Sequence, residues 1–247
     1  LFSNFSENKL KHRLQRLVIE KICLKIIDDF LFLGEGEYEH VLNIYKNYAN
    51  KFHLVPFGVD TDFWKNESEY VQADKEYILF IGNDLNRDYD FLKELARNME
   101  DYNFVFLTSR LNNNDINSKN VEIYEGMWWN NKLSDDAIKT LYKNAILTII
   151  PLKKTLQPSG QSVALQSMCV GTPVLITKTE GFWDKNKYQD DENIFFMNQN
   201  DVTLWKNRIK NLLSSDRKLI EVSKKGKKLV SENFNLELFI SRIKKII

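Results

Sequence analysis

The 247-residue sequence is poor in the residue types that mark disulfide-rich and metal-binding proteins. It has two cysteines, Cys23 and Cys169, and both lie in apolar helical patterns. Two thiols so far apart do not make a disulfide framework, and they favour a reduced, cytoplasmic compartment. The three histidines are scattered at His12, His40 and His53, so no spacing typical of metal ligands emerges.

Long hydrophobic runs and an excess of one charge are also absent. The longest apolar run, around residues 146–152, has about seven residues, whereas a membrane-spanning helix needs roughly 18. No transmembrane helix is therefore expected. Lys+Arg 35 against Asp+Glu 34 leaves a net charge of +1, which predicts no general attraction to nucleic acid and requires any anion site to be local. Residues 1–8 match no signal peptide and lack an initiator Met, so we expect the sequence to be a fragment.

An alternation of strand and helix patterns fills most of the chain, and 43% hydrophobic residues suffice for a buried core. Strands are expected at residues 30–33, 53–56, 78–81, 104–107, 121–124, 146–150, 174–177 and 194–197. Helices are expected at residues 10–27, 34–48, 89–99, from 134, from 159, and at 199–213, 216–230 and 236–247, with a polar linker up to about residue 75. The order predicts the α/β class, with a Rossmann-like doubly wound parallel sheet and helices on both faces.

The stretch 151–177 reads as strand, loop, helix, turn and strand. Ser159 and Gly160 begin its helix, whose unpaired amides would face the carboxyl end of the preceding strand. Such a helix start binds phosphate, and Gly160 lets a ligand approach the backbone. Ser162 and Gln166 share the polar face of this helix. A Ser-Gly helix start is also a common helix cap, so a purely structural role stays open.

A second polar segment follows the expected strand 78–81, at the same sheet edge. It contains Gly82, Asn83, Asp84 and, at the start of the next helix, Arg87. Arg87 suits a clamp on a diphosphate, or an exposed arginine paired with a neighbouring aspartate. Lys153 likewise suits a phosphate contact or a solvated loop charge.

Three blocks of sequence carry a resemblance to a known family. Residues 55–62 resemble the linker between the two domains of GT-B glycosyltransferases, specifically the retaining family 4 group. Residues 78–87 are similar to the first strand and phosphate loop of that group's second domain. Residues 141–151 and 162–174, with their Gly-Thr-Pro turn, are similar to its main signature. The resemblance implies a nucleotide-sugar donor, a glycan or lipid-linked acceptor, no nucleic-acid partner and no metal or other cofactor.

The resemblance also implies roles for single residues. Arg87 and Lys153 would stabilise the leaving diphosphate as catalytic groups. The donor would be bound by Gly82, Asn83, Asp84, Met127, Trp128, Gln157, Ser159, Gly160, Gln161, Ser162 and Gln166. For Met127 and Trp128 a contact with the base competes with aromatic packing. Two glutamates common in the family are replaced by Pro158 and Gln166, and its usual arginine after the first strand is replaced by Asn83.

The implied organisation has three parts. Residues 1–56 would be the end of an N-terminal acceptor domain with its linker strand, residues 57–233 the nucleotide-sugar-binding domain, and residues 234–247 a C-terminal helix packing back toward the N-terminal part. Such a chain alone should bind donor but transfer sugar poorly. The lost carboxylates also suit a non-catalytic, degenerate nucleotide-binding subunit. The basic helix 9–25 suits either contact with an anionic membrane or a solvated face.

The sequence favours neither a metal site nor a nicotinamide cofactor. Asp60-Thr61-Asp62 matches the Asp-x-Asp pattern of metal-dependent glycosyltransferases, but it follows the linker strand rather than a donor pocket. A nicotinamide-dependent dehydrogenase would need Gly-x-Gly-x-x-Gly after the first strand of the alternation, where only Gly82 is present.

Overall fold

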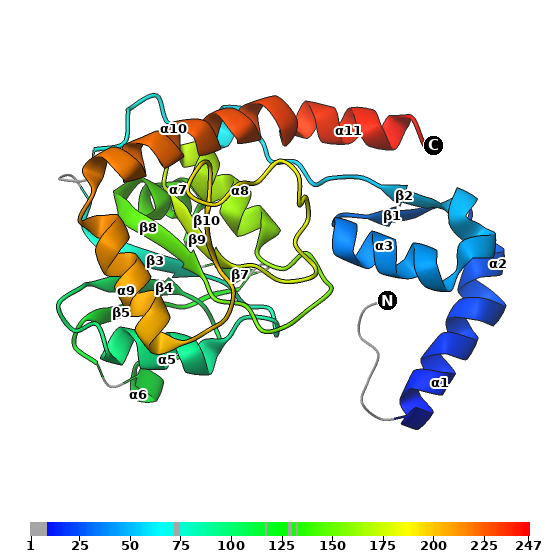
Figure 1. Ribbon diagram of the computed structural model, residues 1–247, viewed down its shortest axis with the longest axis horizontal. Coiled ribbons are helices and arrows are strands. Elements are labelled where there is room, and N and C mark those ends of the chain that lie inside the picture. Colours follow the sequence, from blue (N-terminus) through cyan, green and yellow to red (C-terminus); the bar gives the residue numbers. More distant parts are fainter. Residues whose placement is uncertain (1–8, 72–74, 117, 128–129, 132) are drawn as a thin grey trace.

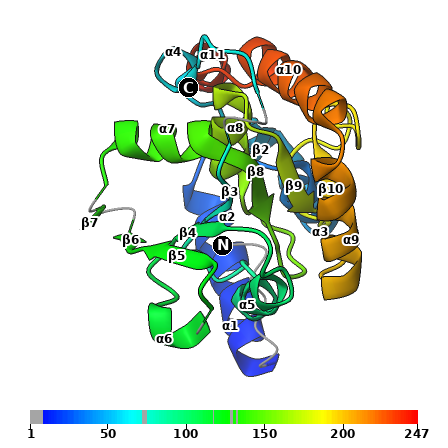
Figure 2. The same ribbon diagram turned by 90° about the vertical axis from the view of Figure 1, so that its left-hand side faces the viewer.

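A six-stranded, fully parallel sheet forms the body of the protein in the computed structural model, which describes residues 9–71, 75–116, 118–127, 130–131 and 133–247. Its strands lie in the order β10-β9-β8-β3-β4-β5 (Figure 2). They are β3 (Tyr77–Ile81), β4 (Phe104–Leu107), β5 (Val121–Tyr124), β8 (Ala145–Ile150), β9 (Val174–Thr177) and β10 (Phe195–Met197). The first strand of the sheet, β3, lies in its middle. The chain adds β4 and β5 on one side of β3 and then places β8 on the other side. This is the Rossmann order, so the predicted fold class is confirmed.

Helices cover both faces of the sheet, which is why most strands are nearly continuous apolar runs. One face packs against α5 (Tyr89–Arg97), α6 (Asn113–Ile116) and α9 (Val202–Leu213). The other packs against α4 (Thr61–Trp64), α7 (Asp135–Asn144) and α8 (Gln161–Val170). The long helix α10 (Asp216–Asn233) contributes Leu219 to the first cluster and Val230 to the second. A short antiparallel pair, β6 (Gly126–Met127) with β7 (Asn130–Asn131), follows β5.

The N-terminal residues form a separate unit beside this body (Figure 1). It contains α1 (Lys9–Val18), a π-helical turn (Ile19–Cys23), α2 (Leu24–Ile26), β1 (Phe30–Phe32), α3 (Glu35–Ile44), a 3₁₀ turn (Lys46–Lys51) and β2 (Phe52–Leu54). β1 and β2 pair in parallel, and Phe30, Phe32 and Phe52 pack edge to face between the strands and α3. The strands expected in this region are therefore confirmed.

The segment between the two units is more ordered than the polar linker that its composition predicts. Asp60 Oδ1 accepts hydrogen bonds from the amides of Asp62 and Phe63 at 3.0 Å and so caps α4. The C-terminal helix α11 (Leu236–Lys244) packs back onto the residues just before this cap, with the rings of Phe57 and Phe239 5.5 Å apart. In the part of the chain that the structure describes, no helix combines the length and apolar character that crossing a bilayer requires.

Candidate donor-binding site

The topological switch of the sheet lies between β3 and β8, and a cavity of about 740 Å³ lies beside it, at the carboxyl ends of β3 and β4. Ligands of open α/β sheets bind in the crevice outside the carboxyl ends of the strands at such a switch point. The cavity is lined by the loops that follow β3, β4 and β5 and by the first turns of α7 and α8. Six of the residues predicted from sequence line it: Gly82, Asn83, Asp84, Arg87, Ser162 and Gln166.

Arg87 is the central group of this cavity. Its side chain is only 3% exposed, and Nε lies 3.5 Å from Asp84 Oδ2. Among the described residues, neither Nε nor Nη1 has a hydrogen-bond partner. Burial lowers the pKa of Arg87 below its usual value, and the charge of Asp84 opposes that shift. Of the interpretation as an exposed arginine paired with an aspartate, the exposure is therefore wrong, whereas the ion pair, with Asp84, is present.

Two glycines make room for this guanidinium. A Cβ atom at Gly82 would lie 2.4 Å from Arg87 Nε, and one at Gly160 would lie 2.8 Å from Nη1 and 2.7 Å from a methyl carbon of Ile150. Gly160 also has a φ of 82°, in the left-handed region that favours glycine. The sequence suggested that Gly160 admits a ligand, whereas in the structure the group next to it is the Arg87 guanidinium.

Helix α8 begins two residues later than Ser159, at Gln161, and no side chain caps it. The first-turn amides of an α-helix have no intrahelical acceptor, so this end carries a partial positive charge. The turn that bears these amides lies beside Arg87 and contributes Ser162 to the cavity wall. Arg87 and the start of α8 thus place a full and a partial positive charge on the same side of the cavity.

The loop after β3 is held rigidly. Asn83 Nδ2 donates to the carbonyl of Gly126 at 2.6 Å, while its Oδ1 accepts from the amide of Ser109 at 2.7 Å. The Tyr89 hydroxyl donates to the carbonyls of Gly82 and Asp84 at 3.3 and 2.9 Å. Asn83 therefore ties together the loops after β3, β4 and β5.

The polar face of α8 consists of the two residues predicted from the sequence. Ser162 and Gln166 line the cavity, while Leu165 and its apolar neighbours are buried in the core. The hydroxyl of Tyr142, which is fully buried, donates to Gln166 Oε1 at 3.1 Å. This bond fixes the carboxamide, so Nε2 is the group that Gln166 can offer to a ligand.

Four other predicted residues are not among those that line the cavity. Lys153 is exposed, and its charge reaches Asp90, whose pKa is lowered mainly by Lys93. Gln161 is buried, and its Nε2 donates to the carbonyl of Leu33 in the N-terminal unit at 3.2 Å. Gln157 and Ser159 both accept hydrogen bonds from Asn86 Nδ2, at 2.9 and 2.7 Å. The loop turns toward the N-terminal unit, where Pro158 lies against Gly34.

Two predicted base contacts cannot be assigned a place. Met127 has its backbone in β6, but its side chain lies outside the described residues. Trp128 lies outside them altogether. Of the lining residues that sequence reasoning missed, Arg110 and Asp135 are the charged ones. Arg110 had a usable signal, because it follows the strand 104–107 at the same sheet edge.

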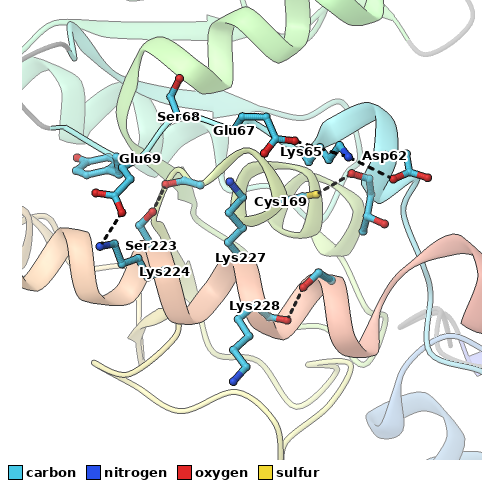
Figure 3. A pocket seen from close by; sticks show the side chains of 14 residues that line it. Asp62, Lys65, Glu67, Ser68, Glu69, Cys169, Ser223, Lys224, Lys227 and Lys228 are labelled. Carbon is cyan, nitrogen blue, oxygen red and sulfur yellow. Dashed lines mark hydrogen bonds and ion pairs between the residues drawn. The ribbon is translucent and has the colours of Figure 1, made fainter.

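A second cavity, of about 640 Å³, lies between α4 and α10, beside Gly171 at the amino edge of the sheet (Figure 3). Lysines line it, and two of them are paired with carboxylates: Lys224 with Glu69 at 3.0 Å, and Lys65 with Asp62 at 3.7 Å. Lys227 donates to the carbonyl of Asn66. Within the described ranges no three metal-ligating side chains gather, and Asp60 of the Asp-x-Asp pattern serves as a helix cap.

Comparison with known proteins now decides the family. The model of the family "Glycosyl transferases group 1" matches residues 62–229. The chain belongs to this family. The match includes the cavity from the loop after β3 to the polar face of α8. None of the curated protein sequences compared with the chain matches it.

Solved structures of glycosyltransferases share the fold at low identity. Sucrose-phosphate synthase from Thermosynechococcus elongatus matches with a TM-score of 0.74 and 17% identity over 98% of this chain and 63% of that one. The Anabaena protein HepE, in complex with UDP and glucose, matches with a TM-score of 0.76 and 12% identity over 99% of this chain and 69% of that one. A glycosyltransferase from Rickettsia africae matches with a TM-score of 0.72 and 14% identity over 99% of this chain and 68% of that one. The chain therefore has a GT-B-type fold and spans less than two thirds of the length of the synthase.

Proposed function

We propose that this chain is the donor-binding part of a retaining, family 4 glycosyltransferase, which moves a sugar from a nucleotide-sugar to a glycan, lipid or other acceptor. The observation that carries the proposal is the Arg87 guanidinium, buried at the cavity wall with Nε and Nη1 lacking hydrogen-bond partners among the described residues. A buried donor without a partner costs about 1–3 kcal/mol, and more if it is charged. A bound diphosphate would supply the missing acceptors and the opposite charge.

The same groups would act in the reaction. When the bond between sugar and diphosphate breaks, negative charge grows on the leaving diphosphate. Arg87 and the first-turn amides of α8 are in place before that happens, because the guanidinium is buried and packed beside Gly82 and Gly160. Donors preorganised toward developing charge stabilise the transition state more than the ground state. Ser162 and Gln166 would hold the nucleoside side of the donor through hydrogen bonds. This chemistry needs no metal or organic cofactor.

A second candidate function is that of a non-catalytic nucleotide-binding subunit. Pro158 and Gln166 stand where the family commonly has two glutamates, and Pro158 is packed against Gly34 of the N-terminal unit. The chain thus lacks a carboxylate at either position. A binding-only protein would bind the nucleotide-sugar but neither hydrolyse nor transfer it under any condition.

The acceptor side is proposed from residues 1–56, as the end of an acceptor domain that continues beyond this sequence. Parallel sheets normally have both faces covered, whereas Leu31 on the outer face of β1 is 41% exposed. A stripe of apolar side chains on the preceding helices is also exposed: Leu14, Leu17, Val18, Ile22 and Ile26. Further chain packed on these surfaces would complete the domain, so the present chain should bind donor but transfer sugar poorly. Cytoplasmic location and contact of the basic helix with a membrane stay predictions.

The experiment is calorimetric titration of the 247-residue chain with UDP, GDP and ADP, followed by the corresponding nucleotide-sugars. We expect at least one nucleoside diphosphate to bind with a Kd below about 1 mM and inorganic pyrophosphate to compete with it. Failure of all three nucleotides to bind would overturn the proposal. Binding without any sugar transfer, in a longer chain that includes a complete acceptor domain, would favour the binding-only function.

A further inference from the structure

The family resemblance leaves the cavity short of one positive charge, because Asn83 stands where the family usually has an arginine. The structure shows that Asn83 has a different task. Its side chain bonds to Gly126, Thr108 and Ser109, so it joins three loops and offers no charge to a ligand. Lys153, the sequence-based candidate for compensation, is exposed and does not line the cavity.

Arg110 is a second cation beside Asn83. It comes from the loop after β4, and its Nε donates to the backbone carbonyl of Asn83 at 3.0 Å. Its own amide donates to Thr108 Oγ1 at 3.1 Å, which fixes the start of the side chain. Because β4 pairs with β3 in the sheet, this loop lies directly beside the loop of Gly82. Arg110 therefore lines the same cavity as Arg87.

The geometry points to Arg110 as the second phosphate-binding cation of the cavity. In the described part of the chain, its only side-chain hydrogen bond uses Nε, so both terminal nitrogens remain for a ligand. Two parallel N–H donors of a guanidinium match two oxygens of one phosphate. Arg87 is buried and Arg110 is exposed, so a diphosphate would be held between a fixed cation at the wall and a solvent-facing one at the rim.

Two further observations place both cations at the same loop. The pKa of Tyr89, which burial and Asp84 raise to about 12, is lowered by Arg87 and also by Arg110. The hydroxyl of Tyr89 bonds to the carbonyls of Gly82 and Asp84. Both arginines therefore lie close to the loop that carries Gly82 and Asp84. This inference rests on the proposed function, since it assumes that the cavity binds a nucleoside diphosphate.

The test compares Arg110→Gln with the matched control Arg97→Gln in the full chain. Arg97 is also exposed and also holds a neighbouring loop, by donating from Nε to the carbonyl of Ile116 at 3.0 Å, but it does not line the cavity. Each protein is titrated calorimetrically, at two salt concentrations, with UDP, UMP and uridine, or with the GDP or ADP series if wild type prefers that base. Thermal unfolding of each variant is measured alongside, to show that it is folded.

We expect Arg110→Gln to bind the diphosphate about tenfold more weakly than wild type, which corresponds to about 1.4 kcal/mol. The salt dependence of binding should also become weaker, while nucleoside binding and the Arg97→Gln variant stay unchanged. Diphosphate affinity within twofold of wild type in Arg110→Gln would overturn the inference and leave the proposed function standing. An equal loss for diphosphate and nucleoside would also overturn it, because that pattern indicates contact with the base or ribose. Absence of nucleotide binding by wild type would overturn the proposed function itself.

Discussion

Replacing Arg87 by methionine should separate the stability of this protein from its binding function. The Arg87 side chain is 3% exposed, and two of its nitrogens lack hydrogen-bond partners within the described residues. Each such group costs roughly 1–3 kcal/mol. The opposing contribution is the contact with Asp84, whose side chain is 43% exposed, and a pair of this kind is worth about 0–1 kcal/mol. A methionine of similar length fills the space without these penalties. Arg87→Met should therefore be at least as stable as wild type and up to about 2 kcal/mol more stable.

Nucleotide binding should change in the opposite direction. Hydrogen bonds from a charged group are worth about 1.5–3 kcal/mol each, so loss of the guanidinium should weaken diphosphate binding at least about tenfold. Urea unfolding measures the first effect, and calorimetric titration with the preferred nucleoside diphosphate measures the second.

Arg208→Met serves as the control for this pair of measurements. Arg208 Nη2 is bonded to Asp191 at 2.9 Å and to Asp190 at 3.2 Å, far from the loop after β3 in sequence, and it does not line the cavity. Its removal should lower stability by up to about 1 kcal/mol and leave binding unchanged. A loss of more than about 2 kcal/mol in Arg87→Met would refute the reasoning, because it would mean that the guanidinium is a satisfied structural group. Unchanged nucleotide affinity in that variant would refute it equally.

Three more substitutions test the surroundings of the cavity. Gly160→Ala and Gly171→Ala both place a side chain at positive φ, but among the described residues a Cβ at Gly171 would meet only Ser223 Oγ, at 3.5 Å. Each variant should lose about 1–2 kcal/mol in urea unfolding. Only Gly160→Ala, which displaces the buried guanidinium, should also weaken nucleotide binding. Tyr142→Phe frees the carboxamide of Gln166, so nucleoside affinity should fall a few-fold while pyrophosphate affinity, measured by competition, stays the same. Ser134→Ala removes the cap of α7, in which Ser134 Oγ accepts a hydrogen bond from the amide of Ala137 at 3.2 Å. The free energy of unfolding should fall by about 1 kcal/mol with no change in nucleotide affinity. A marked loss of nucleotide binding would contradict a purely structural role for Ser134.

The sheet could be predicted from sequence because its strands are short apolar runs separated by helical patterns. The alternation implies parallel strands, and the positions of Gly82 and Gly160 after two of them mark the edge where ligands bind. Helix α4 could not be predicted in the same way. It has only four residues, Thr61–Trp64, so it shows no periodicity, and the cap at Asp60 was its one local sign.

The details of the cavity depend on contacts between distant segments. The burial of Arg87 results from the loop after β3 packing beside Gly160. Nothing in the local spacing distinguishes this from an exposed arginine. Lys153 was expected at the cavity as a phosphate contact and Gln161 as a donor-binding residue, both from the family resemblance. The intervening loop instead turns toward the N-terminal unit, where Gln161 bonds to Leu33. Arg110 required the order of the strands, since only the pairing of β4 with β3 brings it to Asn83.

A crystal structure of the chain soaked with its preferred nucleoside diphosphate tests the central claim most directly. We expect diphosphate density at the carboxyl ends of β3 and β8, in contact with the Arg87 guanidinium and the first-turn amides of α8. Density for the nucleotide in the second cavity beside Lys227, or with its phosphates turned away from Arg87, would contradict the account.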